Sequence, residues 1–192
     1  MVHKNKLAPE NIIANTRYWV ESTVIHYNLC PFANKVLTSG RLHFEVSTAN
    51  DAEELLEDCL LAVNKMLASS REEIETSLLI HPNTMNQFAD YNDFLGMVDA
   101  MLEEMNLLGI IQVASFHPDY CFADCDKDDA SNYTNRSPYP MLHLLREQSI
   151  SEALDDWAAR SLDVEQIPRR NIETMRKLGS KILAAQLADC YK

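Results

Sequence analysis

Most of the residues that could do chemistry lie in one segment, "SFHPDYCFADCDKDDASNYTNRSPYPMLHLLRE", residues 115–147. It holds histidines, carboxylates, arginines, cysteines and amides, and its central part shows neither helical nor strand periodicity. A loop of this length without regular structure is uncommon in a compact domain, where it is usually functional or disordered. We therefore expect a binding or active site in this segment.

His117 and Asp119 are the candidate acid–base pair of this segment. An imidazole exchanges protons near neutral pH, and a carboxylate beside it can hold the ring in one orientation. We expect His117 to be the catalytic acid or base and Asp119 to orient it. The alternative is structural: Asp119 caps the turn after Pro118, and His117 is a buried, hydrogen-bonded histidine.

His143 is a second candidate, for catalysis or for metal binding. We expect a helix over residues 140–148, in which His143 and Glu147 stand four positions apart and so share a face. His143 would then be a second proton donor or a metal ligand. The alternative is a solvated helix face on which these side chains form ordinary ion pairs.

An anion site is expected where this helix begins. Ser137 followed by Pro138 is typical of a helix N-cap and a first helical residue. The free N–H groups of a helix N-terminus, with Arg136 beside them, would bind a small anionic ligand. The alternative is plain capping, with Arg136 paired to a carboxylate. The expected ligand-binding residues are Asn135, Arg136, Ser137, Tyr139 and Arg146.

A divalent metal is one option for this site. Cys121 and Cys125 are spaced C-x3-C, with His117 four residues earlier, and Asp119 or His143 could complete a zinc tetrahedron. Structural zinc sites usually show two close ligand pairs, and only one pair is present. The acidic run "DCDKDD" lacks the glycine turn of an EF-hand. The sequence leaves the metal and its ligands open.

Cys30 offers a different chemistry. In "LCPFANKVL" Pro31 could open a short helix, and a thiol at a helix N-terminus has a lowered pKa and can act as a nucleophile. The tetrapeptide "CPFA" resembles the active-site motif of single-thiol glutaredoxin-like proteins and some glutathione transferases. A thioredoxin fold has a strand before this cysteine, whereas a helix is expected here. The alternative is a small buried thiol at the end of a helix.

The whole chain has the composition of a globular protein, with 46% hydrophobic and 24% charged residues among 192. This length suits a single domain, residues 1–192. The net charge of -12 argues against a nucleic-acid partner. No apolar run reaches the roughly 18 residues of a membrane span, and "MVHKNKLAPEN" lacks the apolar middle of a signal peptide. We therefore expect a cytoplasmic protein without a membrane partner. Five scattered cysteines do not indicate a disulfide framework.

The elements that must position these residues alternate between helix and strand. Helices between short buried strands favour parallel pairing with right-handed crossovers. We expect an α/β fold, with a small, largely parallel sheet of three to four strands packed with helices, plus C-terminal helices; an α+β fold with an antiparallel sheet is the alternative. Helices are expected over residues 9–27, 51–67, 88–106, 140–148, 150–161 and 171–191, and strands over 41–47, 77–82 and 110–116.

Two predicted strands end in the same way, with His81–Pro82 and His117–Pro118. If these strands are parallel, both histidines lie at one rim of the sheet. Ligands of parallel α/β sheets bind beyond the carboxyl ends of the strands. This expectation places the polar segment and both histidines at a common site.

The motifs "NLCPFA", "FHPDY" and "NYTNRSPYPMLHLLRE" resemble those of a bacterial family of short uncharacterised proteins, domain of unknown function 1415. The resemblance covers most of the chain, including "YNDFL" and "IPRRNIETMRKLG". It implies no activity, substrate or cofactor. It does not extend to Cys121 and Cys125, which weakens the zinc hypothesis. The motif positions it implies are Cys30, His117, Pro118, Asp119, Tyr120, Asn135, Arg136, Ser137, Pro138, His143, Arg146 and Glu147.

Three functions remain in view. The first is an enzyme that acts on a small anionic metabolite by hydrolysis or group transfer at a His/Asp/Arg site. The second is a thiol redox protein that uses Cys30. The third is a non-catalytic binding or scaffold protein, in which the polar loop ties the C-terminal helices to the sheet through capping and bridging hydrogen bonds.

Overall fold

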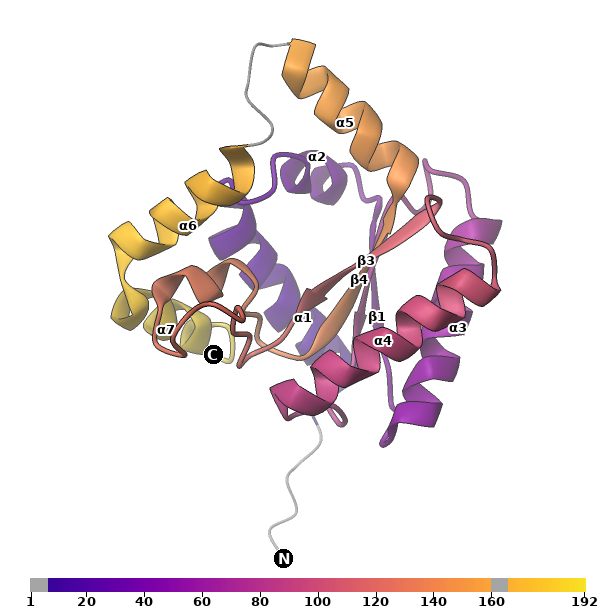
Figure 1. Ribbon diagram of the computed structural model, residues 1–192, viewed down its shortest axis with the longest axis horizontal. Helices are drawn as coiled ribbons and strands as arrows, with labels where there is room; N and C mark the ends of the chain where they lie inside the picture. The colour runs from indigo at the N-terminus through magenta and orange to yellow at the C-terminus, as the bar shows by residue number, and fades with distance from the viewer. Residues whose placement is uncertain (1–6, 160–165) are drawn as a thin grey trace, which may run out of the picture.

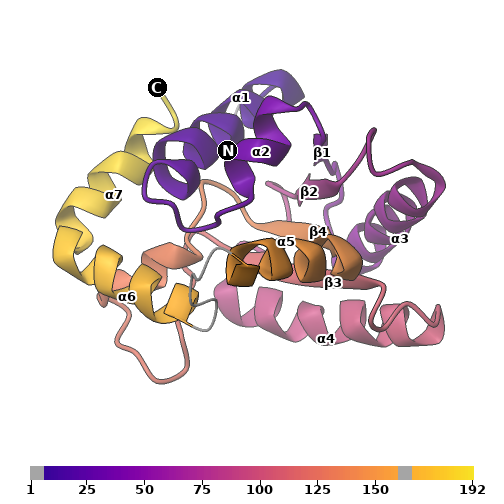
Figure 2. The ribbon, with the colours of Figure 1, turned by 90° about the horizontal axis from the view of Figure 1, so that it is seen from above.

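A four-stranded sheet forms the middle layer of the protein, with helices on both faces (Figures 1 and 2). The computed structural model describes residues 7–159 and 166–192, without the side chains of 156–159. The strand order is β1-β2-β4-β3, so the last strand in the sequence lies between two earlier ones. The strands are β1 (Leu42–Val46), β2 (Thr76–Ile80), β3 (Ile111–Phe116) and β4 (Met141–Arg146).

The sheet is mixed. β1 and β2 pair in parallel, and β4 is antiparallel to both of its neighbours, β2 and β3. β1, β2 and β3 therefore point one way and β4 points the other. The predicted α/β class is confirmed. The expectation of a largely parallel sheet holds for strand direction, whereas only one of the three neighbouring pairs is parallel.

Two crossover helices cover one face of this sheet (Figure 2). α3 (Ala52–Ala68) links β1 to β2, and α4 (Phe88–Glu104) links β2 to β3. Both connections advance in the same direction across the sheet, so crossovers of one hand place both helices on the same face. Asp51 caps α3 by accepting a hydrogen bond from the Glu54 N–H at 2.9 Å.

The apolar periodicity of α3 and α4 predicts most of their buried sides. Leu55, Val63 and Val98 are buried in the core between these helices and the sheet. Leu67 fits the same apolar periodicity but is 38% exposed. It directly follows the buried Met66, and adjacent helical residues point about 100° apart, so only one of the two can face the sheet.

The other face of the sheet is covered by the N-terminal helices. α1 (Pro9–Trp19) continues directly into a π-helical turn, η1 (Val20–Ile25), and α2 (Ala33–Thr38) follows. The first predicted helix is confirmed as a continuous helical segment, with wider winding near its end. Trp19 packs edge-on against Phe116 of β3, with ring centroids 5.3 Å apart. The N-terminal segment therefore lies directly on the sheet.

The prediction of a helix over residues 140–148 is wrong. Met141–Arg146 forms β4, in the middle of the sheet, where Leu142 and Leu144 point into the α3/α4 core. A strand covered on both faces shows no polar alternation, so its sequence cannot be told from a buried helix by periodicity. Pro138 and Pro140 precede an extended strand here and do not open a helix.

The C-terminal part of the chain is helical, as predicted. α5 (Glu147–Ala159) begins where β4 ends, and its predicted end at residue 161 lies outside the described residues. The last predicted helix is two, α6 (Ile167–Leu178) and α7 (Ser180–Asp189). Gly179 separates them with a φ of 83°, a left-handed value that glycine adopts without strain.

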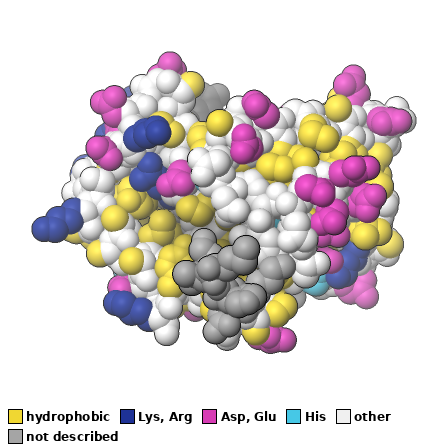
Figure 3. Space-filling view, turned by 90° about the horizontal axis from the view of Figure 1, so that it is seen from below, with side chains coloured by type: hydrophobic (Ala, Val, Ile, Leu, Met, Phe, Trp, Pro, Cys, Tyr) yellow, Lys and Arg dark blue, Asp and Glu magenta, His cyan; other side chains and the backbone are white. Residues whose placement is uncertain are grey.

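Charges are unevenly distributed over the surface. Figure 3 shows carboxylates concentrated on the side of α3 and α4, while most of the visible lysines and arginines lie on the side of α6 and α7. Within the described residues, no helix has the length and hydropathy needed to cross a membrane.

Candidate functional site

The predicted histidine rim exists, but its histidines are packed into the structure. His81 and His117 both pack against the Tyr91 ring, with centroid distances of 5.7 and 5.2 Å. Tyr91 uses its hydroxyl to donate to Met141 O at 2.9 Å and to accept from the Phe116 N–H at 3.1 Å. This stack joins the end of β3 to the start of β4.

Both ring nitrogens of His117 form hydrogen bonds to backbone groups. Its Nδ1 accepts from the Asp119 N–H at 2.9 Å, so Nε2 carries the proton and donates to Met85 O at 3.0 Å. The ring is fully buried, and burial lowers its pKa. The Asp119 carboxylate is on an exposed residue, and the hydrogen bond to the ring comes from the Asp119 backbone. This geometry holds the turn after β3 and leaves no ring nitrogen for a substrate.

The expected anion site is not formed. Ser137 caps no helix, because a strand follows it; its hydroxyl donates to Tyr139 O at 2.7 Å. Arg136 donates to Tyr120 O at 3.1 Å and to Lys127 O at 2.7 Å, with its guanidinium over the Tyr133 ring. The arginine therefore closes the loop on itself.

The remaining polar residues of the loop also bind within the protein. Asn135 donates its amide to Ser115 O at 3.1 Å, and the Tyr139 hydroxyl hydrogen bonds the Asn15 amide at 2.8 Å. Asn132 is fully buried and holds the loop through Phe122 N–H and Asp126 O. The polar side chains of the loop thus form hydrogen bonds within the protein. This is the arrangement expected if the loop has a structural role.

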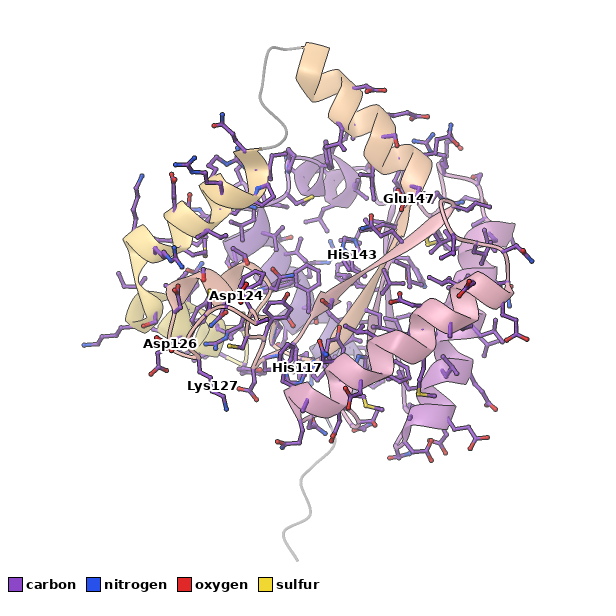
Figure 4. The ribbon with its side chains drawn as sticks, in the orientation of Figure 1. His117, Asp124, Asp126, Lys127, His143 and Glu147 are labelled. Carbon is purple, nitrogen blue, oxygen red and sulfur yellow. The ribbon has the colours of Figure 1, made fainter. Side chains whose placement is uncertain are left out.

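Cys121 and Cys125 do not form a metal site with other described residues. Within residues 7–159 and 166–192, no three or more His, Cys, Asp or Glu side chains lie close enough together to bind one metal ion. The thiol of Cys121 contacts Phe122 O and Cys125 O, each at 3.5 Å, and Cys125 lies 3.7 Å from the Ser131 hydroxyl. Figure 4 shows Asp124, Asp126 and Lys127 in the loop beside α7, apart from His143.

A large cavity lies instead on the face of the sheet that α1, η1 and α2 cover. We call it the sheet-face cavity; its volume is about 920 Å³, within the range of small-molecule sites. Leu78, His143 and Ala114 form its floor, in one row across β2, β4 and β3. The residues between Trp19 and Val36 form its roof, and α5 lies at one end. Three sequence-predicted residues line it: Cys30, His143 and Arg146.

His143 is the polar centre of the floor. Figure 4 places it in the middle of the sheet, away from His117 at the rim and from Glu147 at the start of α5. Thr76 Oγ1 donates to Leu144 O at 2.6 Å, so the same oxygen accepts from His143 Nε2–H at 2.8 Å. This fixes Nδ1 as the nitrogen with the free electron pair. No hydrogen bond to it occurs among the described residues.

The environment keeps His143 uncharged. Burial lowers its pKa from 6.5 to about 4, because the charged form of the ring is poorly hydrated there. At neutral pH the ring is therefore a neutral hydrogen-bond acceptor. The predicted pairing of His143 with Glu147 on one helix face is wrong, because His143 belongs to β4 and Glu147 to α5.

Cys30 lies in the roof of the same cavity. Burial raises the pKa of its thiol, and the N–H groups of Phe32 and Ala33 counteract this only in part. The helix after it, α2, is six residues long. The thiol is therefore held in its protonated form, which is a poor nucleophile.

Charged side chains gather at the α5 end of the cavity. Arg71 donates to both carboxylate oxygens of Glu152, at 3.0 and 2.8 Å, and to Glu75 at 3.0 Å. Arg41 donates to Glu75 at 2.6 Å. Arg146 donates to the carbonyls of Ile74 and Ser69, at 3.2 and 2.9 Å, and also to that of Met66. It therefore closes the C-terminal end of α3 rather than facing a ligand.

The lining residues that the sequence analysis did not select include Trp19, Arg41, Arg71 and Thr76. The apolar spacing of the first helix puts Trp19 on its inner side, but an inward tryptophan normally signals core packing. The two arginines and the threonine carry no motif. The pairing of β1, β2 and β4 brings them to one cavity with His143, and strand register cannot be read from one sequence.

The comparisons with known proteins give a family. The profile of the family described as protein of unknown function, DUF1415, matches residues 11–185. The chain belongs to this family. The resemblance expected from the motifs is thereby confirmed. No curated protein and no solved structure matches the chain.

Proposed function

We propose that this member of the family binds a small organic molecule with a mainly apolar body in the sheet-face cavity, with His143 as its polar anchor. The observation that carries the proposal is a preformed space of about 920 Å³ whose floor presents a ring nitrogen that has no hydrogen bond to any described residue. A neutral acceptor in an apolar pocket favours a ligand that offers an N–H or O–H group.

The walls support an apolar ligand body. Val24 and Val36 line the roof, and Leu78 and Phe116 line the floor. Such walls contribute roughly 25 cal/mol for each Å² of apolar ligand surface removed from water. Binding affinity would come from these walls, and orientation would come from His143.

If the protein is an enzyme, this proposal assigns the catalytic role to a different residue from the one expected. Proton transfer on a bound molecule would use His143 Nδ1, since both nitrogens of His117 are occupied by backbone groups. A pKa near 4 makes His143 a weak base at neutral pH, so binding explains the geometry better than hydrolysis or group transfer does. The protonated thiol of Cys30 likewise gives little support to the redox alternative.

The test uses the fluorescent probe N-phenyl-1-naphthylamine, which has two apolar ring systems and one N–H group. We expect saturable binding to the wild-type protein, with strong fluorescence enhancement. Ala114→Leu fills the floor beside His143 and should weaken binding by about tenfold or more. Gln112→Leu is the matched control, because it adds an apolar side chain two residues earlier on β3 without lining the cavity.

Near-ultraviolet circular dichroism of each variant separates lost binding from lost folding. If Ala114→Leu does not fold, Ala33→Leu in the roof serves the same purpose. Absence of saturable binding to the wild-type protein would overturn the proposal. Equal binding by the wild-type and cavity-filled proteins would overturn the assigned location.

A further inference from the structure

We infer that the occupant of the sheet-face cavity is an amphipathic organic acid, whose anionic group is bound by Arg71 and Lys35 and whose apolar end lies toward Trp19. This inference rests on the proposed function and adds the chemical class of the ligand. Three features of the cavity support it: the order of residues along the strands, the balance of charges, and buried polar atoms that lack partners.

The cavity changes character along the strands. Thr76 and Leu145 form one row, Leu78 and His143 the next, and Ile80 and Met141 the row after that. Arg71 and Glu75 precede Thr76, so the charged end lies beside the first row. The third row reaches Phe116, against which Trp19 packs, so it marks the apolar end. His143 lies in the middle row, roughly 7 Å along the strand from each of the other two rows.

The charges at the cavity favour an anion. Four cationic side chains and three carboxylates line it within the part of the chain that the structure describes. This cationic excess is local, because the whole protein has a net charge of -12. An anion inside a largely apolar space needs such compensation, since a buried charge without a partner costs several kcal/mol. The lining charges are Lys35, Arg41, Arg71 and Arg146, and Glu75, Glu152 and Asp155.

Arg71 can accept a ligand acid at small cost. Its strongest contact, with Glu152, lies at the surface, where the Glu152 side chain is 51% exposed and that of Arg71 is 32% exposed. Exposed ion pairs contribute about 0–1 kcal/mol, so a less hydrated ligand carboxylate can replace Glu152. Lys35 forms no ion pair among the described residues, which leaves a second cation for the acid.

Two buried N–H donors without partners among the described residues line the same cavity. Arg71 Nε and Trp19 Nε1 are inaccessible to solvent and have no hydrogen-bond acceptor among the described residues. Trp19 is only 2% exposed, and an unpaired buried N–H costs about 1–3 kcal/mol. Since neither atom is accessible to a water-sized molecule, a ligand oxygen reaches either one only after the neighbouring side chains shift. An acid with a carbonyl or ether oxygen in its apolar part would satisfy both atoms after such a shift.

The experiment compares two probes that share one ring framework. N-phenyl-1-naphthylamine is neutral, and 8-anilinonaphthalene-1-sulfonate carries an added sulfonate, which stands in for a carboxylate. We expect the wild-type protein to bind the sulfonate about tenfold more tightly than the neutral probe. Arg71→Gln and Lys35→Gln should each reduce this preference several-fold, measured as the ratio of the two probe affinities within each variant.

Matched controls locate the effect. Arg169→Gln removes a highly exposed arginine of α6, which does not line the cavity, and should leave both affinities unchanged. Ala114→Leu should weaken both probes, which separates cavity binding from adsorption to surface cations. Aliphatic and aromatic carboxylates should then displace the sulfonate probe, and the stronger competitors identify the apolar body.

The outcomes distinguish the two proposals. If neither probe binds, the proposed function fails. If the neutral probe binds and the sulfonate binds no more tightly, the proposed function stands and the organic-acid inference is overturned. Tight sulfonate binding that neither Arg71→Gln nor Lys35→Gln reduces would overturn the assigned anion-binding residues.

Discussion

At the scale of single residues, His143 is an imidazole that the fold keeps uncharged. Burial lowers its pKa from 6.5 to about 4, so between these pH values the unfolded chain binds a proton that the folded protein does not. The free energy of unfolding must therefore fall as the pH falls from 6.5 toward 4. For this residue alone the loss between pH 8 and pH 5 is about 2 kcal/mol.

His143→Gln should remove this part of the acid sensitivity. We expect the difference in unfolding free energy between pH 8 and pH 5 to shrink by about 2 kcal/mol, as measured by urea denaturation. Some acid sensitivity will persist, because His81 is also buried and its pKa is likewise lowered to about 4. A variant that loses as much stability as the wild-type protein would contradict the environment assigned to His143.

Cys30 provides a second residue-scale prediction. Because burial raises the pKa of its thiol, iodoacetamide should modify it slowly at pH 7 and faster as the pH rises above 9. Bound N-phenyl-1-naphthylamine should slow this modification, since Cys30 lines the cavity. Peptide mapping by mass spectrometry measures the rates.

Cys121 is the internal control for this measurement, because it is also partly exposed but does not line the cavity. Its rate should not respond to the probe. Rapid alkylation of Cys30 at pH 7 would instead revive the thiol redox alternative, since that chemistry needs an exposed, acidic thiol.

At the scale of elements, the loop between β3 and β4 is held closed by hydrogen bonds between its own residues. Arg136 joins its two halves through Tyr120 O and Lys127 O, 16 and 9 residues away in sequence. Hydrogen bonds from a charged donor contribute roughly 1.5–3 kcal/mol each. The loop should therefore open when this side chain is removed.

Arg136→Met should lower the free energy of unfolding by about 2–4 kcal/mol and expose the loop to limited proteolysis. Arg169→Met is the control, because Arg169 is exposed and pairs with Glu173 one turn away. Probe binding in the sheet-face cavity should survive in Arg136→Met. If Arg136→Met lost probe binding but resisted proteolysis as well as the wild-type protein does, the loop itself would be a candidate binding site.

The elements show which parts of the fold a single sequence can predict. Strands β1 to β3 and helices α3 and α4 follow from periodicity, because each buries one side or is a short apolar run between helices. β4 was missed because "MLHLLR" is rich in helix-favouring residues and is covered on both faces. Tertiary burial overrides propensity at such a central position.

The candidate site was predicted only in part, for a related reason. Cys30 and His143 were selected for their chemistry, and both line the cavity. The polar loop attracted attention by its composition, yet its polar groups are used to hold backbone. A cavity arises from the volumes of side chains on several elements, so no local pattern marks Trp19 or Arg71 as its neighbours.

At the scale of the whole molecule, the sheet separates two differently packed halves. The α3/α4 side is a closed core that includes Leu55, Val63, Phe94 and Leu142. The opposite side contains the sheet-face cavity, so apolar packing there is incomplete. A cavity of this size in the core is a stability cost that ligand binding would offset.

The most direct test of the central claim is to locate a bound molecule by nuclear Overhauser contacts to protein labelled at alanine methyl groups. With N-phenyl-1-naphthylamine bound, the account predicts contacts to Ala33, Ala114 and Ala153, which line the sheet-face cavity. It predicts none to Ala62, which is buried on the α3 side of the sheet. Contacts to Ala14, beside a separate hollow of about 430 Å³, without contacts to Ala114, would contradict it.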